Sequence, residues 1–357
     1  METTGHPTET ADAVRIDGER AAYRAHVRGR KIAYLDTDAW IRLGRDGDEL
    51  AARCRSLCES AVGRKRVIFP LSYAACSELV QQAPSPSRDA RVGVMQLLSE
   101  GIAFRDTATI RRIEAEAAVP LLLGEAPTEP DVSRFFAGVQ ECISDMADPS
   151  CDRPLPERVV WRARHSDILK SLAEFVRICD RLGKHEESKT FFADRGEILA
   201  SSIAGAAEAS RDGSGKVNRK RAFTREAAST VLNTAVPALR SALEKRPPED
   251  ARRVSEGARN DPGGPEHLRE RLFAMPSVAN EAELFGQRVV QTPPKHGWRN
   301  DFWDIEHAIV PSAYSDAWVT LDRGLARLVR GCEAPRRRGC AVLASMEEFA
   351  AWLEEQA

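Results

Sequence analysis

Two short apolar segments, one near each end of the chain, finish on an aspartate. Residues 31–35 lead into Asp36, and residues 317–321 lead into Asp322. If both segments are strands of an open parallel sheet, functional groups gather beyond the carboxyl ends of those strands, where the strand order reverses. We therefore expect the two aspartates to share one crevice, although they are far apart in the sequence.

Further acids accompany this pair. Glu78 lies on a predicted helix after the second strand, and Asp301 and Asp304 begin a predicted helix before the penultimate strand. Clustered carboxylates repel one another and usually persist only around hard cations. Mg²⁺ takes one or two carboxylates together with waters and a substrate phosphate. The acids therefore predict a site for one or two divalent ions that activate a water molecule.

The elements that would position these acids form a β-α-β pattern at each end of the chain. Continuous apolarity at residues 31–36 is typical of a strand buried on both faces of a parallel sheet. The expected elements that follow are a helix over about 39–62, a strand at 67–69, helices at 72–82 and 87–99, and a strand at 102–104. Near the C-terminus we expect strands at 317–322 and 340–344, a turn at 336–338 and a last helix at 346–355. This alternation predicts a parallel α/β sheet flanked by helices.

The alternation stops between residues 111 and 296. Residues 168–182 follow the spacing of one apolar helix face, and residues 186–209 and 222–245 are similar. Residues 246–268 are rich in Pro, Gly and charge, so we expect a mobile loop there. The sequence predicts an all-helical insertion.

The expected organisation therefore has three parts. Residues 1–28 are polar and are expected to form an N-terminal tail or a marginal helix. Residues 29–110 and 297–357 together are expected to form the α/β domain. Residues 111–296 would form the insertion that interrupts it.

At this point the residues resemble the PIN-domain nuclease family. The family pattern is an apolar strand ending Asp-Thr-Asn/Asp, a Glu in the first turns after the next strand, a helix-starting Asp, and a strand ending Thr-x-Asp. The matching residues here are Tyr34-Leu35-Asp36-Thr37-Asp38, Glu78, Asp304 and Val319-Thr320-Leu321-Asp322. The segment 300–308 is similar to a PIN subgroup with Asp-x-x-His in this helix. The resemblance covers about residues 29–110 and 297–357.

The resemblance implies a PIN-like fold and a metal-dependent endonuclease that hydrolyses phosphodiester bonds, with single-stranded RNA a more probable substrate than DNA. It implies that four acids are catalytic and hold Mg²⁺ or Mn²⁺: Asp36, Glu78, Asp304 and Asp322. Neighbouring residues would orient these acids or a metal-bound water: Asp38, Asp301, His307 and Thr320. His307 lies one helical turn after Asp304 and shares its face. We expect it to support the site, because Mg²⁺ prefers oxygen ligands.

Each acid also has a structural interpretation. Asp301, Asp304 and Asp322 could cap helices, where free N–H groups and the helix dipole favour an acid; for Asp301 we favour this interpretation. Asp36 could belong to a turn, and Glu78 could be an ordinary solvated helix residue. The alternative function is accordingly a non-catalytic PIN-like binding or regulatory protein, with the insertion contacting a protein or nucleic-acid partner.

Basic residues in the insertion and just before the last strand are candidates for phosphate contacts. They are Arg219, Lys220, Arg221, Arg336 and Arg337. A solvated surface is the simpler interpretation of these residues. The chain has 52 basic and 54 acidic residues, and the resulting net charge of -2 argues against a generally basic nucleic-acid coat protein. A local basic channel remains compatible with it.

Composition restricts the class of protein further. At 42% hydrophobic residues the chain can build a core, yet no apolar run reaches the roughly 18 residues of a membrane helix. The first residues lack the basic start and apolar stretch of a signal peptide. Eight scattered cysteines indicate reduced thiols and a cytoplasmic protein. We expect no membrane contact. A second copy of the chain or a protein partner could bind through the insertion.

Overall fold

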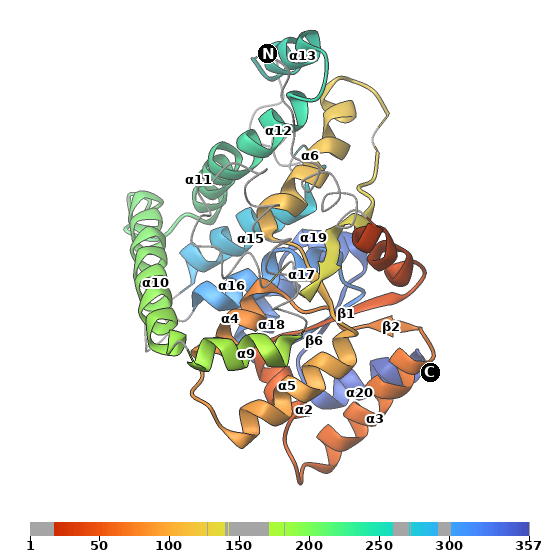
Figure 1. The fold of residues 1–357 in the computed structure, drawn as a ribbon. Coiled ribbons are helices and arrows are strands. Elements are labelled where there is room, and N and C mark those ends of the chain that lie inside the picture. Colours follow the sequence, from red (N-terminus) through yellow and green to blue (C-terminus); the bar gives the residue numbers. More distant parts are fainter. Residues whose placement is uncertain are drawn as a thin grey trace.

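Four parallel strands form the central sheet in the order β2-β1-β5-β6 (Figure 1). Their bounds are Val67–Ile68 for β2, Lys31–Leu35 for β1, Ala317–Val319 for β5 and Ala341–Leu343 for β6. This computed structural model describes residues 18–126, 128–139, 142, 171–181, 183–259, 271, 273–291 and 301–356. Segments from the two ends of the chain therefore share one sheet, which confirms the α/β class.

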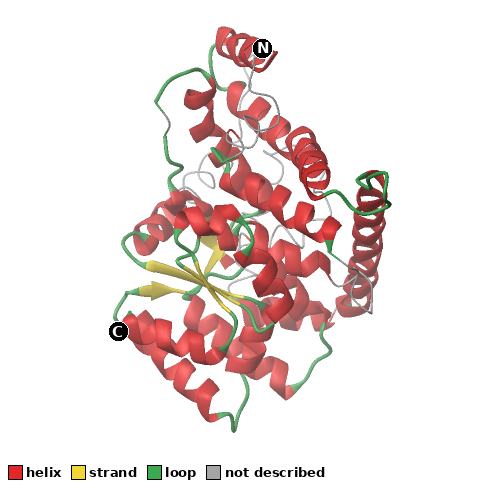
Figure 2. Cartoon of the chain, turned by 180° about the vertical axis from the view of Figure 1, so that it is seen from behind, coloured by secondary structure: helices red, strands yellow, loops and turns green. Residues whose placement is uncertain are grey.

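Alternate residues of β1 supply two different cores. Ala33 and Leu35 pack with Trp40, Phe69 and Phe349 on one face of the sheet. The other face carries Ile32 and Tyr34, which pack with residues of β5 and of the helices between positions 305 and 329. Burial on both faces explains why the strand is continuously apolar rather than alternating. Figure 2 shows helices on both sides of the sheet.

Helices α2 (Thr37–Leu43), α3 (Glu49–Gly63), α5 (Pro86–Ser99) and α20 (Met346–Glu355) contribute to the first core. The single helix expected over about 39–62 is wrong, because the chain breaks between α2 and α3. Gly47 has φ +78° there, a conformation that glycine adopts without strain. Asp48 then begins α3, its Oδ1 accepting a hydrogen bond from the Ala51 N–H at 3.0 Å.

The sheet continues beyond β2 through an irregular connection. Leu71 forms an isolated parallel bridge with Ala103 of β3 (Ile102–Phe104). Strand β4 (Phe136–Gly138) then pairs antiparallel with β3. The rings of Phe104 and Phe136 lie 4.7 Å apart between centroids, so the pairing buries aromatic surface. The prediction of an all-helical insertion is therefore wrong. Strand β4 was missed because three residues are too few to show the alternating apolar pattern of a strand.

The helices that cover the second face are short. They are α16 (Asp301–Ile309), α17 (Pro311–Tyr314), α18 (Arg323–Arg330) and α19 (Glu333–Arg338). Helix α19 replaces the turn expected at residues 336–338. At the N-terminus, residues 18–27 are helical, in agreement with the expected marginal helix and not with a tail. Residues 1–17 lie outside the described part.

The other described helices belong to the insertion, except α4, which lies in the α/β part, and α6, which leads from that part into the insertion. They are α4 (Tyr73–Gln81), α6 (Thr107–Leu122), α9 (Leu172–Arg181), α10 (Lys184–Ala209), α11 (Arg219–Thr230), the π-helical turn η2 (Val231–Ala235), α12 (Val236–Leu243), α13 (Pro248–Arg259) and α15 (Pro276–Val290), with a single 3-10 turn η1 at Val132–Phe135. The long helix α10 packs against both α4 and α16 (Figure 1). An ion pair joins α9 to α5, with Arg88 Nη1 and Asp180 Oδ1 2.9 Å apart. Helices of the insertion therefore pack directly against helices of the α/β part.

The mobile loop expected near residues 246–268 is wrong for its first half, because α13 occupies Pro248–Arg259. Pro248 suits the first turn of a helix, and Glu249 and Asp250 lie where the helix dipole favours acids. These start signals were outweighed by the polar composition of the segment. Residues 260–268 lie outside the described part.

No helix of the described ranges is long and apolar enough to cross a membrane. The seven described cysteines are free thiols, and all but Cys340 are buried. Cys54 and Cys58 lie together in the first core, as residues on one buried helix face.

Candidate functional site

The two strand-end aspartates lie at neighbouring strands. Asp36 follows β1 directly, and its N–H donates to the Val319 carbonyl of β5 at 3.0 Å. Thr320 follows β5, is fully buried, and hydrogen-bonds the Asp36 carboxylate. From β1 the chain runs outward to β2 on one side, whereas β5 lies on the other side. The strand order therefore reverses between β1 and β5, at the kind of crevice where open α/β sheets bind ligands.

Asp36 is held in a protected environment. Its side chain is 5% exposed, and Oδ1 accepts a hydrogen bond from the Ala39 N–H at 3.0 Å, which caps α2. Burial raises the pKa of Asp36 to about 7, against the opposing effects of the Thr320 hydrogen bond and the nearby His307. A buried carboxylate at this position is costly to ionise without a cation nearby.

Glu78 of α4 and His307 of α16 meet beside Asp36. His307 Nε2 lies 2.8 Å from Glu78 Oε2, and the Thr37 hydroxyl donates to the same carboxylate oxygen. Burial acts to raise the pKa of Glu78, but the charge and hydrogen bond of His307 outweigh it and hold that pKa below its usual value. His307 therefore contacts one of the four predicted acids, and its supporting role stays a prediction.

The other ring nitrogen of His307 is occupied as well. His307 Nδ1 hydrogen-bonds the Tyr34 hydroxyl, which also lies 2.6 Å from Ser72 Oγ. Burial acts to lower the pKa of His307, but the charge of Glu78, followed by its hydrogen bond and by Asp36 and Asp304, raises it above the usual value. Hydrogen bonds thus hold the imidazole at both nitrogens. They form a series that runs from the Ser72 hydroxyl through Tyr34 and His307 to the Glu78 carboxylate.

Tyr34, Thr37 and Ser72 belong to this network, and no role in the site was predicted for them. A signal exists for two of them, Tyr34 and Ser72. Tyr34 brings the only side-chain hydroxyl into β1, and Ser72 has the residue type of a helix cap, accepting from the Ala75 N–H at 3.1 Å. The sequence does not reveal their partner, because His307 lies in a distant part of the chain.

Asp38 and Asp322 lie at the exposed rim of this edge. Partial desolvation raises the pKa of Asp38, with contributions from the charges of Glu78 and Asp322. Asp322 caps α18, its Oδ1 accepting from the Leu325 N–H at 2.9 Å. The capping interpretation is therefore correct for the hydrogen bonds of Asp322.

Asp304 and Asp301 are placed by α16. Asp304 is half-buried, and its charge acts on His307 one turn later. Asp301 is the first residue of the helix, and its side chain lies outside what the structure describes. Trp318 Nε1 donates to the His307 carbonyl at 3.0 Å and ties this helix to β5.

The donor chemistry at this edge suits a hard divalent cation, since it consists of carboxylate oxygens that repel one another. The geometry is less complete. Among the described residues, no three His, Cys, Asp or Glu side chains are grouped closely enough to hold a metal ion. Asp36 and Asp322 cap helices, and Glu78 is held by His307 and Thr37. The acids share an edge without forming a ready-made cage.

The basic candidates lie elsewhere. Arg219, Lys220 and Arg221 are exposed in the first turn of α11. Arg336 and Arg337 are in α19, which leads into the amino end of β6. Because the strands are parallel, that end lies at the sheet edge opposite to Asp36, and the Arg337 guanidinium instead sits 3.9 Å from the centroid of the Phe273 ring. The structure does not bring Arg336 and Arg337 to the acids.

Comparison of the chain with protein-family models, with curated proteins and with solved structures found no match.

Proposed function

We propose that the chain is a PIN-like, metal-dependent endonuclease that hydrolyses phosphodiester bonds, with single-stranded RNA as the preferred substrate. The observation that supports this most is the position of Asp36 and Asp322. Both follow adjacent parallel strands at the point where strand order reverses, and Glu78 and His307 approach the same edge from α4 and α16. The preference for RNA rests on the family resemblance.

In this proposal the four acids Asp36, Glu78, Asp304 and Asp322 would hold Mg²⁺ or Mn²⁺. Such an ion supplies a more acidic bound water and stabilises charge on phosphate oxygens. Asp38 is exposed at the rim, within reach of the charges of Glu78 and Asp322, and would add negative charge that attracts the ion.

The surrounding groups fix the acids. Thr320 holds the Asp36 carboxylate from the neighbouring strand, and His307 holds Glu78 from α16. The Tyr34 hydroxyl keeps the imidazole in one orientation. Partners of this kind position metal-binding groups and tune their basicity.

The non-catalytic alternative also has an observation in its favour. Each of three acids already has a structural role, Asp36 and Asp322 as helix caps and Glu78 as the partner of His307. A binding protein could keep all three contacts for stability alone. It would have no reason to bind Mn²⁺ at this edge.

Cleavage of a fluorescently labelled single-stranded oligoribonucleotide in Mn²⁺ or Mg²⁺ tests the proposal. Wild-type protein should cleave it only with the metal, and Asp36→Asn should remove the activity. Asp106→Asn is the matched control, because Asp106 also follows a strand (β3) and caps a helix, accepting from the Thr109 N–H at 2.8 Å. Wild-type protein without metal-dependent cleavage of RNA or DNA would favour the non-catalytic alternative.

A further inference from the structure

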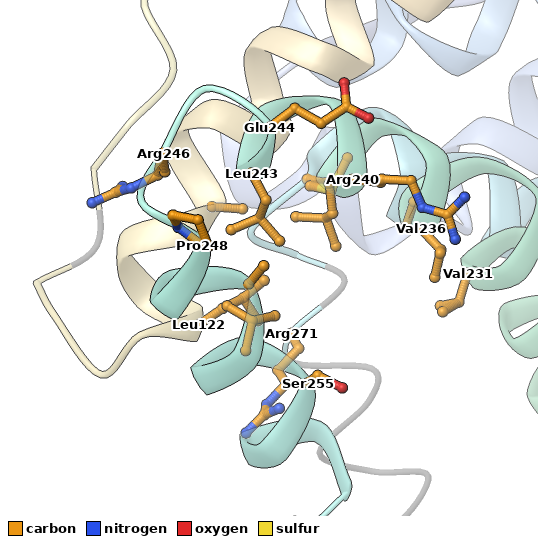
Figure 3. Close-up of a pocket in the computed structure, with 16 residues that line it drawn as sticks. Leu122, Val231, Val236, Arg240, Leu243, Glu244, Arg246, Pro248, Ser255 and Arg271 are labelled. Carbon is orange, nitrogen blue, oxygen red and sulfur yellow. The ribbon is translucent and has the colours of Figure 1, made fainter.

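A large apolar pocket lies in the helical insertion (Figure 3). Its volume is about 690 Å³, within the range of roughly 300–1,000 Å³ that is typical of small-molecule sites. Its walls come from the end of α6, from η2, α12 and α13, and from the residues before α15. None of the described lining residues belongs to the sheet or to α4 and α16, so the pocket is separate from the strand-end acids.

The interior of the pocket is aliphatic. Leu122, Leu239, Leu243, Val254 and Met275 contribute branched or flexible hydrocarbon side chains. None of the described lining residues is aromatic. A nucleobase or another flat ring would find no ring to stack on, whereas a hydrocarbon chain can pack against every wall.

The charged residues of the pocket are predominantly basic. Arg240, Arg246 and Arg271 line it, together with a single acid, Glu244. Arg246 Nε pairs with Asp250 Oδ2 at 2.9 Å, whereas Arg240 is exposed and has no ion pair with any residue of the described ranges. Figure 3 shows the Arg240 guanidinium beside Val231 and Val236. An arginine at the edge of an apolar pocket favours an anionic head group.

A local break in helix geometry shapes one wall. The Val236 N–H bonds the Val231 carbonyl, five residues back, so the helix forms a π turn at η2. Pro237 follows in the first turn of α12 and has no N–H to continue the regular α-helical ladder. The wider turn presents Val231 and Ala235 to the pocket. Single π turns of this kind occur frequently at functional sites.

We propose that this pocket binds a linear aliphatic carboxylate. The hydrocarbon chain would lie among the leucine, valine and methionine side chains, and the carboxylate would face Arg240 at the edge. A free base, a nucleotide or a cationic amphiphile fits the lining less well. The proposal is independent of the nuclease activity proposed above.

Calorimetric titration with dodecanoate, below its micelle-forming concentration, tests the pocket directly. The wild-type chain should show one saturable site. Ser255→Trp, at an exposed position of the lining, should remove binding because the indole fills the space. Arg240→Gln should weaken binding by about tenfold, the value of one lost charge-assisted hydrogen bond.

Arg252→Gln is the matched control, since Arg252 is exposed on α13 but is not part of the lining. It should bind dodecanoate as the wild type does. Thermal melting of each variant checks that the fold is intact. An absence of saturable binding to the wild-type chain, or unchanged binding in a folded Ser255→Trp variant, would overturn the proposal. Equal affinity for dodecanol and dodecanoate would overturn the assignment to a carboxylate.

Discussion

The sheet edge around Asp36 and the pocket in the insertion have opposite chemistry. The edge collects carboxylates on neighbouring strands and fixes them through buried polar contacts such as the one between Tyr34 and His307. The pocket has aliphatic walls and basic residues at its border. A site that is rich in acids suits a cation and its phosphate ligand, whereas the pocket suits an apolar anion.

The comparison also shows how differently the two regions are built. The edge is a consequence of topology, because parallel strands deliver their carboxyl ends to one side of the sheet. The pocket is a consequence of helix packing, with the π turn at Val231–Ala235 and Pro237 forming one wall. The first kind of site can be located from strand ends in a sequence, and the second cannot.

The largest expected effect concerns the acids at the edge. Asp36→Asn and Asp304→Asn should each lower metal-dependent cleavage of single-stranded RNA by more than about 100-fold, since loss of a group that only supports a metal ligand already costs ten- to 100-fold. Initial rates in Mn²⁺ measure this. An Asp36→Asn variant with wild-type activity would show that Asp36 only caps α2.

The sequence predicts Asp36 and Asp322 as candidates because each follows a strand that has a clear local signal. The strand expected at residues 31–36 is observed at Lys31–Leu35, and the last helix lies where it was expected, at Met346–Glu355. Each has a clear local signal, a continuous apolar run or a Ser cap before a helical period. The contact between Glu78 and His307 was not predicted, because it joins α4 to α16 and depends on their packing.

The errors have physical causes as well. Strand β4 is three residues long and is stabilised by Phe104 of β3. Phe104 lies about 30 residues earlier, so the pattern of residues around β4 gives no sign of this contact. The polar composition of residues 246–268 predicts a loop where helix α13 forms, although Pro248 and Glu249 are start signals for a helix. The split between α2 and α3 depends on the left-handed Gly47, which a helical period alone does not reveal.

The second prediction concerns His307. His307→Gln should lower cleavage by roughly 10- to 100-fold and destabilise the fold by about 1–3 kcal/mol, because Tyr34 and Glu78 lose a buried partner. Thermal melting and initial rates test the two effects separately. A variant that loses stability but keeps full activity would make His307 a core residue only.

The third prediction concerns Asn280 of α15, which joins the insertion to the edge. Its side-chain amide donates to the carbonyls of Ala308 and Ile309 at 3.0 and 2.8 Å, at the end of the helix that carries His307. Asn280→Ala should cost about 1–3 kcal/mol of stability, because these buried acceptors lose their donor. Chemical denaturation measures the loss. A change below about 0.5 kcal/mol would indicate that the contact is replaceable.

The fourth prediction concerns pH. Asp36 has a pKa of about 7 in the folded chain against an ordinary value of 3.8, so between these values the folded state keeps a proton that the unfolded state releases. Metal-free stability should therefore fall as pH rises from about 4 to 7 and change little above that range. Asp36→Asn should remove this contribution. Melting temperatures at several pH values, for both proteins, measure the difference, and identical slopes would contradict the assignment to Asp36.

The smallest expected effect separates the two regions. Ser255→Trp should leave RNA cleavage within about twofold of the wild type, and Asp36→Asn should leave dodecanoate affinity unchanged, because sites with no shared contacts are usually energetically independent. Cross-measurement of both activities in both variants tests this. A large loss in either direction would show that the pocket and the edge are coupled.

The central claim is that the sheet edge holds a divalent cation, and direct Mn²⁺ titration tests it most directly. Free Mn²⁺ can be followed by electron paramagnetic resonance as protein is added, using wild type, Asp36→Asn and Asp106→Asn. We expect saturable binding to the wild type and to Asp106→Asn, with binding to Asp36→Asn weaker by about tenfold or more. Failure of the wild type to bind Mn²⁺, or equal binding by all three proteins, would contradict the account.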